Sequence, residues 1–195
     1  MVDRKSLITR KTKETDIKLA MKIDGAGRVR SDSGVGFLNH MLDLFGKHSG
    51  FDLELEAMGD LEVDAHHSVE DIAICLGMAL KECLGDKKGI NRYGHVILPM
   101  DEALVMVAVD LSGRGHLELD AKFNAPVVGD LDTELVEDFL RSFALNGGFT
   151  LHVRVITGRN THHVIEAIFK GLGRSLKMAV ARGNGGEVPS TKGVL

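Results

Sequence analysis

The sequence has only two cysteines and no long apolar run, and each shortage excludes a class of protein. No stretch approaches the roughly 20 apolar residues that a membrane helix needs, and the N-terminus MVDRKSLITR lacks the apolar segment of an export signal. We therefore expect a cytoplasmic protein. Cys75 and Cys83 fall in one helical pattern without a CxxC motif, so no disulfide framework is indicated. We interpret both as buried small hydrophobic residues.

The charge balance argues against a nucleic-acid partner. The formal net charge is −4, so we do not expect a nucleic-acid partner. With 44% hydrophobic and 27% charged residues, the composition is typical of a soluble protein with a substantial core. The 195 residues correspond to about one and a third average domains, which suits two half-domains that share one core.

The stretch DAHHSVED, residues 64–71, places two histidines side by side and a glutamate three positions later. Adjacent residues on a helix diverge by about 100°, whereas residues three or four apart share a face. Glu70 can therefore align with His66 or with His67, but one metal ion cannot easily take both histidines from this turn.

The same pattern returns in NTHHVIEA, residues 160–167, as His162, His163 and Glu166. Residues 66–81 and 162–177 are identical at eight of sixteen aligned positions. Upstream, an offset of 98 aligns Phe45, Gly50, Phe51 and Leu53 with Phe143, Gly148, Phe149 and Leu151, and aligns His40 with Asp138. The pattern indicates one duplicated unit rather than two unrelated domains.

Hydrophobic periodicity gives both halves the same order of elements. Strands are expected over 16–24, 51–58, 103–110, 116–123 and 149–156, with a further short strand at RVRS, and helices over 36–48, 66–85, 132–146 and 161–181. These elements predict an α+β fold, an internally duplicated β-β-α-β-α unit with two small mixed sheets and four helices packed between them. The first half covers 1–94, the second covers 95–182, and 183–195 form a flexible tail that closes over substrate, all within one compact domain.

The repeated HHxxE turns indicate a metal site. Imidazoles and carboxylates together suit divalent Mn, Fe, Co or Zn, and no thiolate is placed to favour a softer metal. Two turns that each diverge in two directions fit two ions better than one. Each ion could take one histidine from each turn and a carboxylate, with His40 adding to one of the sites.

Six motifs, spread in order over essentially the whole chain, resemble the imidazoleglycerol-phosphate dehydratase family of histidine biosynthesis. They are FLNHML, DAHHSVED, PMDE, DLSGR, GRNTHHVIEAIFK and the terminal STKG. The resemblance implies a lyase with two Mn²⁺ ions per active site that dehydrates imidazole glycerol phosphate to imidazole acetol phosphate. It also implies a homo-oligomer of 24 subunits with octahedral symmetry, whose metal sites lie where subunits meet.

The resemblance further implies the metal ligands, which fall on His40, His66, His67, Glu70, His162, His163 and Glu166. One position departs from the family pattern, because Asp138 stands where many members have a histidine. An aspartate can bind a hard cation through oxygen, either directly or through water.

The chemistry of the reaction explains why cations are needed. No carbonyl acidifies the proton that must leave, so the imidazole ring acts as the electron sink, and the family is thought to hold it as an imidazolate between two cations. The resemblance assigns the proton transfers, and substrate contact, to Glu14 in KTKETDIK. From the residues alone, Glu14 would be interpreted as a solvated surface charge.

The substrate phosphate needs cationic partners, and arginine matches its oxygens well. The resemblance places these partners at Arg92, Arg114, Ser190 and Lys192. From the residues alone, both arginines could be ordinary surface residues, and simple disorder is the stronger interpretation of the Gly-rich tail. Asp101 and Glu102 of PMDE are candidates for orienting ligands or water.

Two other functions remain open at this point. A non-catalytic, metal-templated assembly would use the same histidine and glutamate turns without a phosphate site. A dinuclear phosphoester hydrolase would use the turns and the cationic residues together.

Overall fold

Side chains that alternate between core and surface explain the strands of this fold. The computed structural model describes residues 3–183, 186–193 and 195. In β2 (Thr15–Lys22), Ile17, Leu19 and Met21 are buried, whereas the residues between them are exposed or half-buried. A strand with one apolar face must cover that face, so it lies in a sheet that packs against other elements.

The strands form two four-stranded mixed sheets of order β1-β2-β4-β3 and β5-β6-β10-β7. In each sheet the last pair is parallel and the other neighbours are antiparallel. The first half contains β1 (Lys5–Lys11), β2, β3 (Val29–Asp32), α1 (Gly36–Ser49), β4 (Asp52–Gly59) and α2 (His66–Leu84). The second half contains β5 (Tyr93–Met100), β6 (Ala103–Asp110), β7 (His116–Asp120), β8 (Val127–Val128), β9 (Leu131–Asp132), α3 (Leu135–Gly147), β10 (Thr150–Thr157) and α4 (Thr161–Val180).

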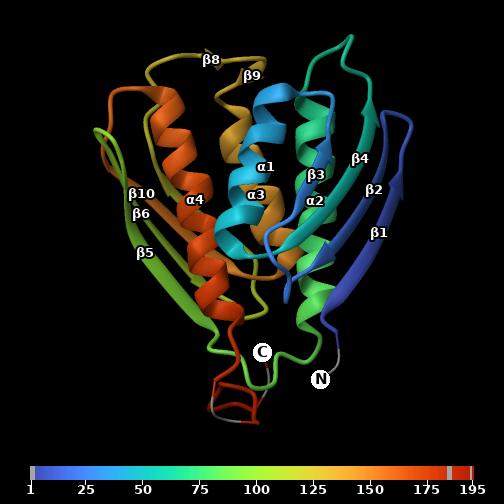
Figure 1. The fold of residues 1–195 in the computed structure, drawn as a ribbon, viewed down its shortest axis with the longest axis vertical. Helices are drawn as coiled ribbons and strands as arrows, with labels where there is room; N and C mark the ends of the chain where they lie inside the picture. The colour runs from blue at the N-terminus through green and yellow to red at the C-terminus, as the bar shows by residue number, and fades with distance from the viewer. Residues whose placement is uncertain (1–2, 184–185, 194) are drawn as a thin grey trace.

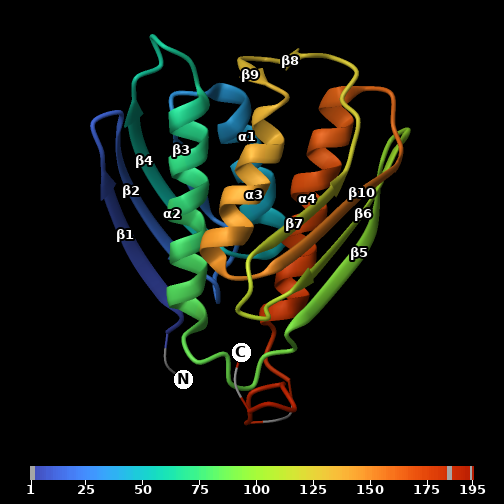
Figure 2. The ribbon, with the colours of Figure 1, turned by 180° about the vertical axis from the view of Figure 1, so that it is seen from behind.

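The four helices lie between the two sheets and cover their inner faces (Figure 1, Figure 2). They pair across the halves, α2 with α3 and α4 with α1. Each pair of helices crosses at a glycine. A Cβ on Gly77 of α2 would lie 2.7 Å from the backbone nitrogen of Gly147, and one on Gly173 of α4 would lie 2.7 Å from the carbonyl oxygen of Phe45. Because glycine has no side chain, the paired backbones can approach this closely.

Aromatic side chains fill the core between the helices. Six phenylalanines are fully buried: Phe45, Phe51, Phe139, Phe143, Phe149 and Phe169. The rings of Phe45 in α1 and Phe143 in α3 meet edge to face with their centroids 5.9 Å apart, a favourable arrangement that joins the two halves. Cys75 and Cys83 are free and buried, as predicted.

The predicted α+β class, with two mixed sheets and four helices between them, is confirmed. The predicted number of strands per half is wrong, because β1 and β5 were not anticipated, nor was the β8-β9 hairpin. β1 and β5 are edge strands with little apolar alternation: among its residues β1 buries only Ile8, and β5 buries only Gly94 and Leu98. A strand that buries so little carries a weak periodic signal.

The direction of the helices sets the position of the candidate site. All four helices begin at the same end of the molecule, next to the β8-β9 hairpin, whereas the tail that follows α4 lies at the opposite end (Figure 1). Within the described part of the chain, no helix is long and apolar enough to cross a membrane.

Candidate metal and active site

The first group of predicted ligands comes together where α1 and α4 begin. His40 projects from α1 and His162 from α4, and both Nε2 atoms face Oε1 of Glu166, at 2.8 Å and 3.2 Å. The potential ligand atoms of these three residues all lie within 4.8 Å of one another. Two imidazoles and a carboxylate at this spacing match the donor set of a divalent ion such as Mn²⁺.

Glu166 is charged despite its burial. Burial alone would raise the pKa of its carboxyl, but hydrogen bonds from Lys170, His40 and His162 outweigh this effect and hold the pKa at about 2. Lys170 Nζ lies 2.6 Å from Glu166 Oε2. Sequence reasoning missed Lys170, although its spacing of four from Glu166 on one helix was a usable signal.

The N-terminus of α1 is held by a residue far away in the sequence. Helix α1 has no side-chain cap of its own, and Asp130 of the β8-β9 hairpin accepts hydrogen bonds from the backbone nitrogens of Gly36 and Phe37, at 2.6 Å and 2.8 Å. The ring of Phe37 then meets that of His162 edge to face, with centroids 5.1 Å apart. These contacts fix the turn that carries His40 against α4.

The second group of predicted ligands lies where α2 and α3 begin. His66 Nδ1 is 4.0 Å from Oδ2 of Asp138. The α3 aspartate thus faces the α2 histidine as His40 of α1 faces His162 of α4, whose ring centroids are 6.0 Å apart. His67 and Glu70 lie in the same turn of α2. Among the described residues, only the group on α1 and α4 has three ligand atoms within 4.8 Å of one another.

A carboxylate accompanies the second histidine of each HHxxE turn. His67 Nδ1 lies 3.1 Å from Asp60 Oδ2, and His163 Nδ1 lies 2.7 Å from Glu102 Oε2. These hydrogen bonds are the largest cause that raises the pKa of each histidine above its ordinary value. In turn, His163 and the backbone amide of Asn160 lower the pKa of Glu102 to about 2.

Glu14 lies in the turn between β1 and β2, with Oε1 3.9 Å from His67 Nε2. The turn is fixed by hydroxyl groups, because Thr12 Oγ1 accepts hydrogen bonds from the backbone nitrogens of Glu14 and Thr15. Thr15 Oγ1 donates to buried Asp71 of α2. The turn that carries Glu14 is therefore anchored to the helix that carries His66, His67 and Glu70.

The residues predicted to bind the phosphate are Arg92, Arg114, Ser190 and Lys192, and they lie away from the metal residues. Arg92, just before β5, donates to both oxygens of Asp110 at 2.7 Å and 3.1 Å, and its Nη1 donates to the carbonyl oxygen of Pro189 at 2.9 Å. Arg114 and Lys192 are exposed, and Ser190 is half-buried. The start of β5 and the tail after α4 lie at the end of the molecule opposite the helix N-termini (Figure 1), so within one chain Arg92, Ser190 and Lys192 do not reach those N-termini.

The predicted flexible tail, 183–195, falls partly outside the described residues. Asn184 and Gly185 are not described, whereas Gly183 donates a backbone hydrogen bond to Gly89 at 2.8 Å. The backbone nitrogen of Gly89 donates to the carbonyl oxygen of Glu187 at 3.0 Å. With the Arg92 contact, these bonds join the described tail to the segment that precedes β5.

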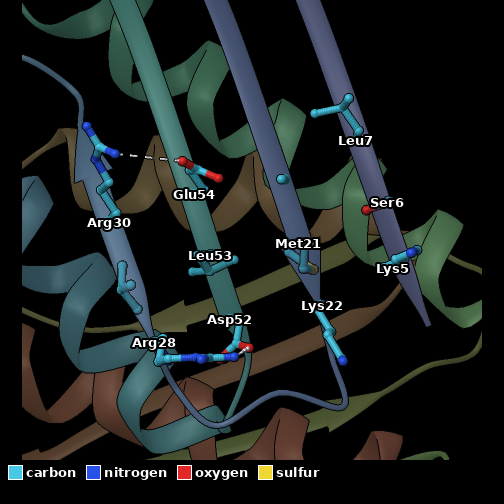
Figure 3. Close-up of a pocket in the computed structure, with 12 residues that line it drawn as sticks. Lys5, Ser6, Leu7, Met21, Lys22, Arg28, Arg30, Asp52, Leu53 and Glu54 are labelled. Carbon is cyan, nitrogen blue, oxygen red and sulfur yellow. Dashed lines mark hydrogen bonds and ion pairs between the residues drawn. The ribbon is translucent and has the colours of Figure 1, made fainter. Parts of the chain in front are cut away.

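An open cavity of about 680 Å³ on the first sheet contains none of the predicted site residues (Figure 3). Basic side chains on β1 and β2 and at β3 surround acidic Asp52 and Glu54 of β4. Arg30 is 4.0 Å from Glu54, and Arg28 is 3.2 Å from Asp52. These two ion pairs join β3 and the residue before it to β4, and such surface pairs stabilise a sheet modestly.

Comparisons with known proteins converge on one family. Residues 33–176 match the sequence profile of the family described as Imidazoleglycerol-phosphate dehydratase. The protein of that name from Pelotomaculum thermopropionicum is 56% identical over 195 residues, covering all of both chains. The one from Desulforudis audaxviator is 57% identical over the same length, again covering all of both chains.

Two solved structures have the same architecture. The dehydratase of that name from Staphylococcus aureus superposes with a TM-score of 0.83 at 43% identity, covering 91% of this chain and 99% of the other. The enzyme from Pyrococcus furiosus, in complex with (S)-C348, gives a TM-score of 0.84 at 37% identity, covering 96% of this chain and all of the other.

Proposed function

The chain belongs to the imidazoleglycerol-phosphate dehydratase family, and from this premise we propose how its residues carry out the reaction. The enzyme is a lyase of histidine biosynthesis that removes water from imidazole glycerol phosphate. The two alternative functions, a non-catalytic metal-templated assembly and a phosphoester hydrolase, find no support among these relatives.

Two Mn²⁺ ions per active site are the proposed cofactors. The single observation that carries this proposal is the convergence of His40, His162 and Glu166 on one point. The complete set of proposed ligands adds His66, His67, Glu70, His163 and Asp138. Carboxylate and imidazole donors suit Mn²⁺, and the bound ions would supply positive charge that stabilises the electron-rich imidazole ring of the substrate.

The site is proposed to form between subunits. The proposed metal residues lie near the N-termini of the helices, whereas Arg92 precedes β5 and Ser190 and Lys192 follow α4. The start of β5 and the tail after α4 lie at the end of the molecule opposite the helix N-termini (Figure 2). We infer that one chain does not present both groups to one small substrate. A second copy would supply the missing part. An assembly of several copies is therefore proposed, and the family resemblance gives its size as 24 subunits.

The assembly can be tested by removing the metal. Chelation should convert the large particle to a smaller species, and added Mn²⁺ should restore the large particle, because the ions would bridge chains. Light scattering measures the mass. An unchanged mass after complete metal removal would show that the ions do not hold the subunits together.

Glu14 is proposed to move the protons. Its carboxylate is exposed on a turn that is tied to α2, so it can reach a substrate held by that helix. The carboxylate would take the carbon-bound proton and, as the carboxylic acid, would give a proton to the departing hydroxyl, which leaves as water. One residue can serve both transfers because the first leaves it protonated for the second.

The phosphate is proposed to bind Arg92, Arg114, Ser190 and Lys192. Asp110 holds the Arg92 guanidinium through both of its oxygens, which fixes the direction of the remaining nitrogen. That nitrogen contacts the tail at Pro189, next to Ser190. A phosphate bound by Arg92 would therefore also lie close to the tail hydroxyl, as a joint phosphate site requires.

The reaction itself distinguishes the proposal from its rivals. Mn²⁺-loaded protein is incubated with imidazole glycerol phosphate, and the ketone product and inorganic phosphate are both quantified. Formation of imidazole acetol phosphate without phosphate release is the expected result. Phosphate release without the ketone would indicate a hydrolase instead.

A further inference from the structure

The two histidine turns share a feature that their sequences do not show. Among the two histidines of each turn, only the second has a carboxylate within 3.2 Å of its Nδ1 atom in the described part of the chain. The partner of His67 is Asp60, and the partner of His163 is Glu102. The first histidines differ, because His66 Nδ1 is 4.0 Å from Asp138 and His162 uses Nε2 to reach Glu166.

The two carboxylates come from different places in the fold. Asp60 follows β4 and lies seven residues before His67, whereas Glu102 lies in the turn between β5 and β6, far from His163 in the sequence. The sequence repeat therefore does not account for them. Two unrelated segments each bring one carboxylate to the same ring nitrogen, which indicates a shared requirement of these histidines.

We propose that Asp60 and Glu102 are positioning residues that fix the metal-binding nitrogen of His67 and His163. A carboxylate that accepts the Nδ1 proton holds the neutral ring in one tautomer and one orientation, with the Nε2 lone pair free for an ion. It also makes Nε2 a stronger donor. The inference rests on the proposed metal role of the two histidines.

Glu102 has no spare oxygen. Oε2 faces His163, and Oε1 accepts hydrogen bonds from the backbone nitrogens of Arg159 at 3.2 Å and Asn160 at 2.7 Å. The side chain of Asn160 caps α4 by accepting from the backbone nitrogen of His162 at 3.0 Å. Glu102 thus ties the start of α4 to the β5-β6 turn while it orients His163. A glutamine keeps only one acceptor oxygen, so its amide nitrogen would face either the backbone nitrogens of Arg159 and Asn160 or His163 Nδ1. The second arrangement favours the tautomer whose proton lies on Nε2, which blocks that nitrogen as a ligand.

Asp60 differs in a way that provides a control. Both of its oxygens face the same atom, His67 Nδ1, at 3.2 Å and 3.1 Å. An asparagine can therefore keep one acceptor toward the histidine, whereas an alanine keeps none. The chain also offers a matched pair whose residues are not proposed ligands, His116 and Glu118 of β7, whose side chains approach to 3.9 Å.

The test measures Mn²⁺ affinity rather than turnover. Full-length wild type and the variants Glu102→Gln, Asp60→Ala, Asp60→Asn and Glu118→Gln are stripped of metal and titrated with Mn²⁺ at one fixed pH. Free Mn²⁺ is read from its electron paramagnetic resonance signal. Glu102→Gln and Asp60→Ala should weaken the binding of one ion by about 10- to 100-fold, the usual effect of removing such a partner. Asp60→Asn keeps one acceptor but loses the negative charge, so it should weaken binding less than Asp60→Ala does, whereas Glu118→Gln should stay close to wild type.

The outcomes separate this inference from the function on which it rests. Wild type that binds no Mn²⁺ would refute the proposed metal role itself. Wild type that binds two ions, together with wild-type affinity in Glu102→Gln and Asp60→Ala, would overturn the positioning role alone. The positioning role would also be overturned if each variant that loses Mn²⁺ affinity has a correspondingly lower melting temperature without metal, because the two carboxylates would then stabilise the fold rather than orient the histidines.

Discussion

Replacing Glu14 by glutamine tests the proposed proton transfers with little disturbance to the fold. The side chain is about half exposed, and His67 Nε2 lies 3.9 Å from its carboxylate. The turn is held by the Thr12 and Thr15 hydroxyls and not by the carboxylate. The variant should therefore fold, assemble and bind metal as wild type does.

The expected loss of turnover follows from the two roles of the residue. General acid or base catalysis typically supplies a factor of about 10² to 10⁴. On the barrier this factor corresponds to about 3 to 5 kcal/mol, since each tenfold change in rate is about 1.4 kcal/mol. Because Glu14 is proposed to serve both transfers, kcat of Glu14→Gln should fall at least this far.

The assay compares Glu14→Gln with Lys13→Gln, which changes an exposed residue of the same turn. Ketone formation gives kcat, while melting temperature, particle mass and bound metal are recorded for both variants. Lys13→Gln should keep kcat near that of wild type. Near-normal turnover in Glu14→Gln would remove Glu14 from the mechanism, and an equal loss in both variants would show that the turn, not the carboxylate, matters.

Three further changes test other parts of the structure. Deleting residues 188–195 should leave the particle assembled and metal-loaded while raising KM and lowering kcat together, because Ser190 and Lys192 are lost; steady-state constants close to full length would show that the tail takes no part. Gly173→Ala should lower stability in urea unfolding by about 1 to 3 kcal/mol through overpacking, because its Cβ would meet the Phe45 carbonyl at 2.7 Å, whereas Gly186→Ala, with open space around it, should not. Asp52 accepts backbone and side-chain hydrogen bonds from Arg28 that lower its pKa from 3.8 to about 2, so the ionised carboxylate stabilises the folded protein above pH 4 and this stabilisation is lost as the pH falls toward 2. Asp52→Asn should therefore lose less unfolding free energy than wild type between pH 4 and pH 2. The same pH dependence of unfolding in both proteins would contradict this prediction.

The sequence predicted the helices better than the strands, for a physical reason. Each helix buries a continuous stripe, so its periodicity is strong over many residues. The edge strands β1 and β5 bury only one side chain each, Ile8 and Leu98, which leaves almost no alternation to detect. Gly77 and Gly173 occupy equivalent positions of the repeat, which the sequence shows. Only the structure shows that they lie where α2 crosses α3 and where α4 crosses α1.

In the candidate site, too, contacts within one helix follow from the sequence, whereas contacts between distant segments do not. The pairing of His162 with Glu166 follows from their spacing of four on one helix. The approach of His40 to Glu166, 126 positions apart, depends on how α1 packs against α4, and no local pattern encodes it. Asp60 and Glu102 contact the histidines through loops, whose course depends on the finished sheets. Arg92 directly precedes β5, and that the start of β5 lies at the end of the molecule opposite the helix N-termini likewise follows from the topology (Figure 1).

The most direct test of the central claim compares one enzyme preparation in three states. Protein as isolated, after chelation, and after reconstitution with Mn²⁺ is given imidazole glycerol phosphate, and imidazole acetol phosphate is quantified over time. Turnover should disappear on chelation and return with Mn²⁺, because the ions would stabilise the electron-rich ring of the substrate. Full turnover in protein shown by elemental analysis to contain no metal would contradict this prediction.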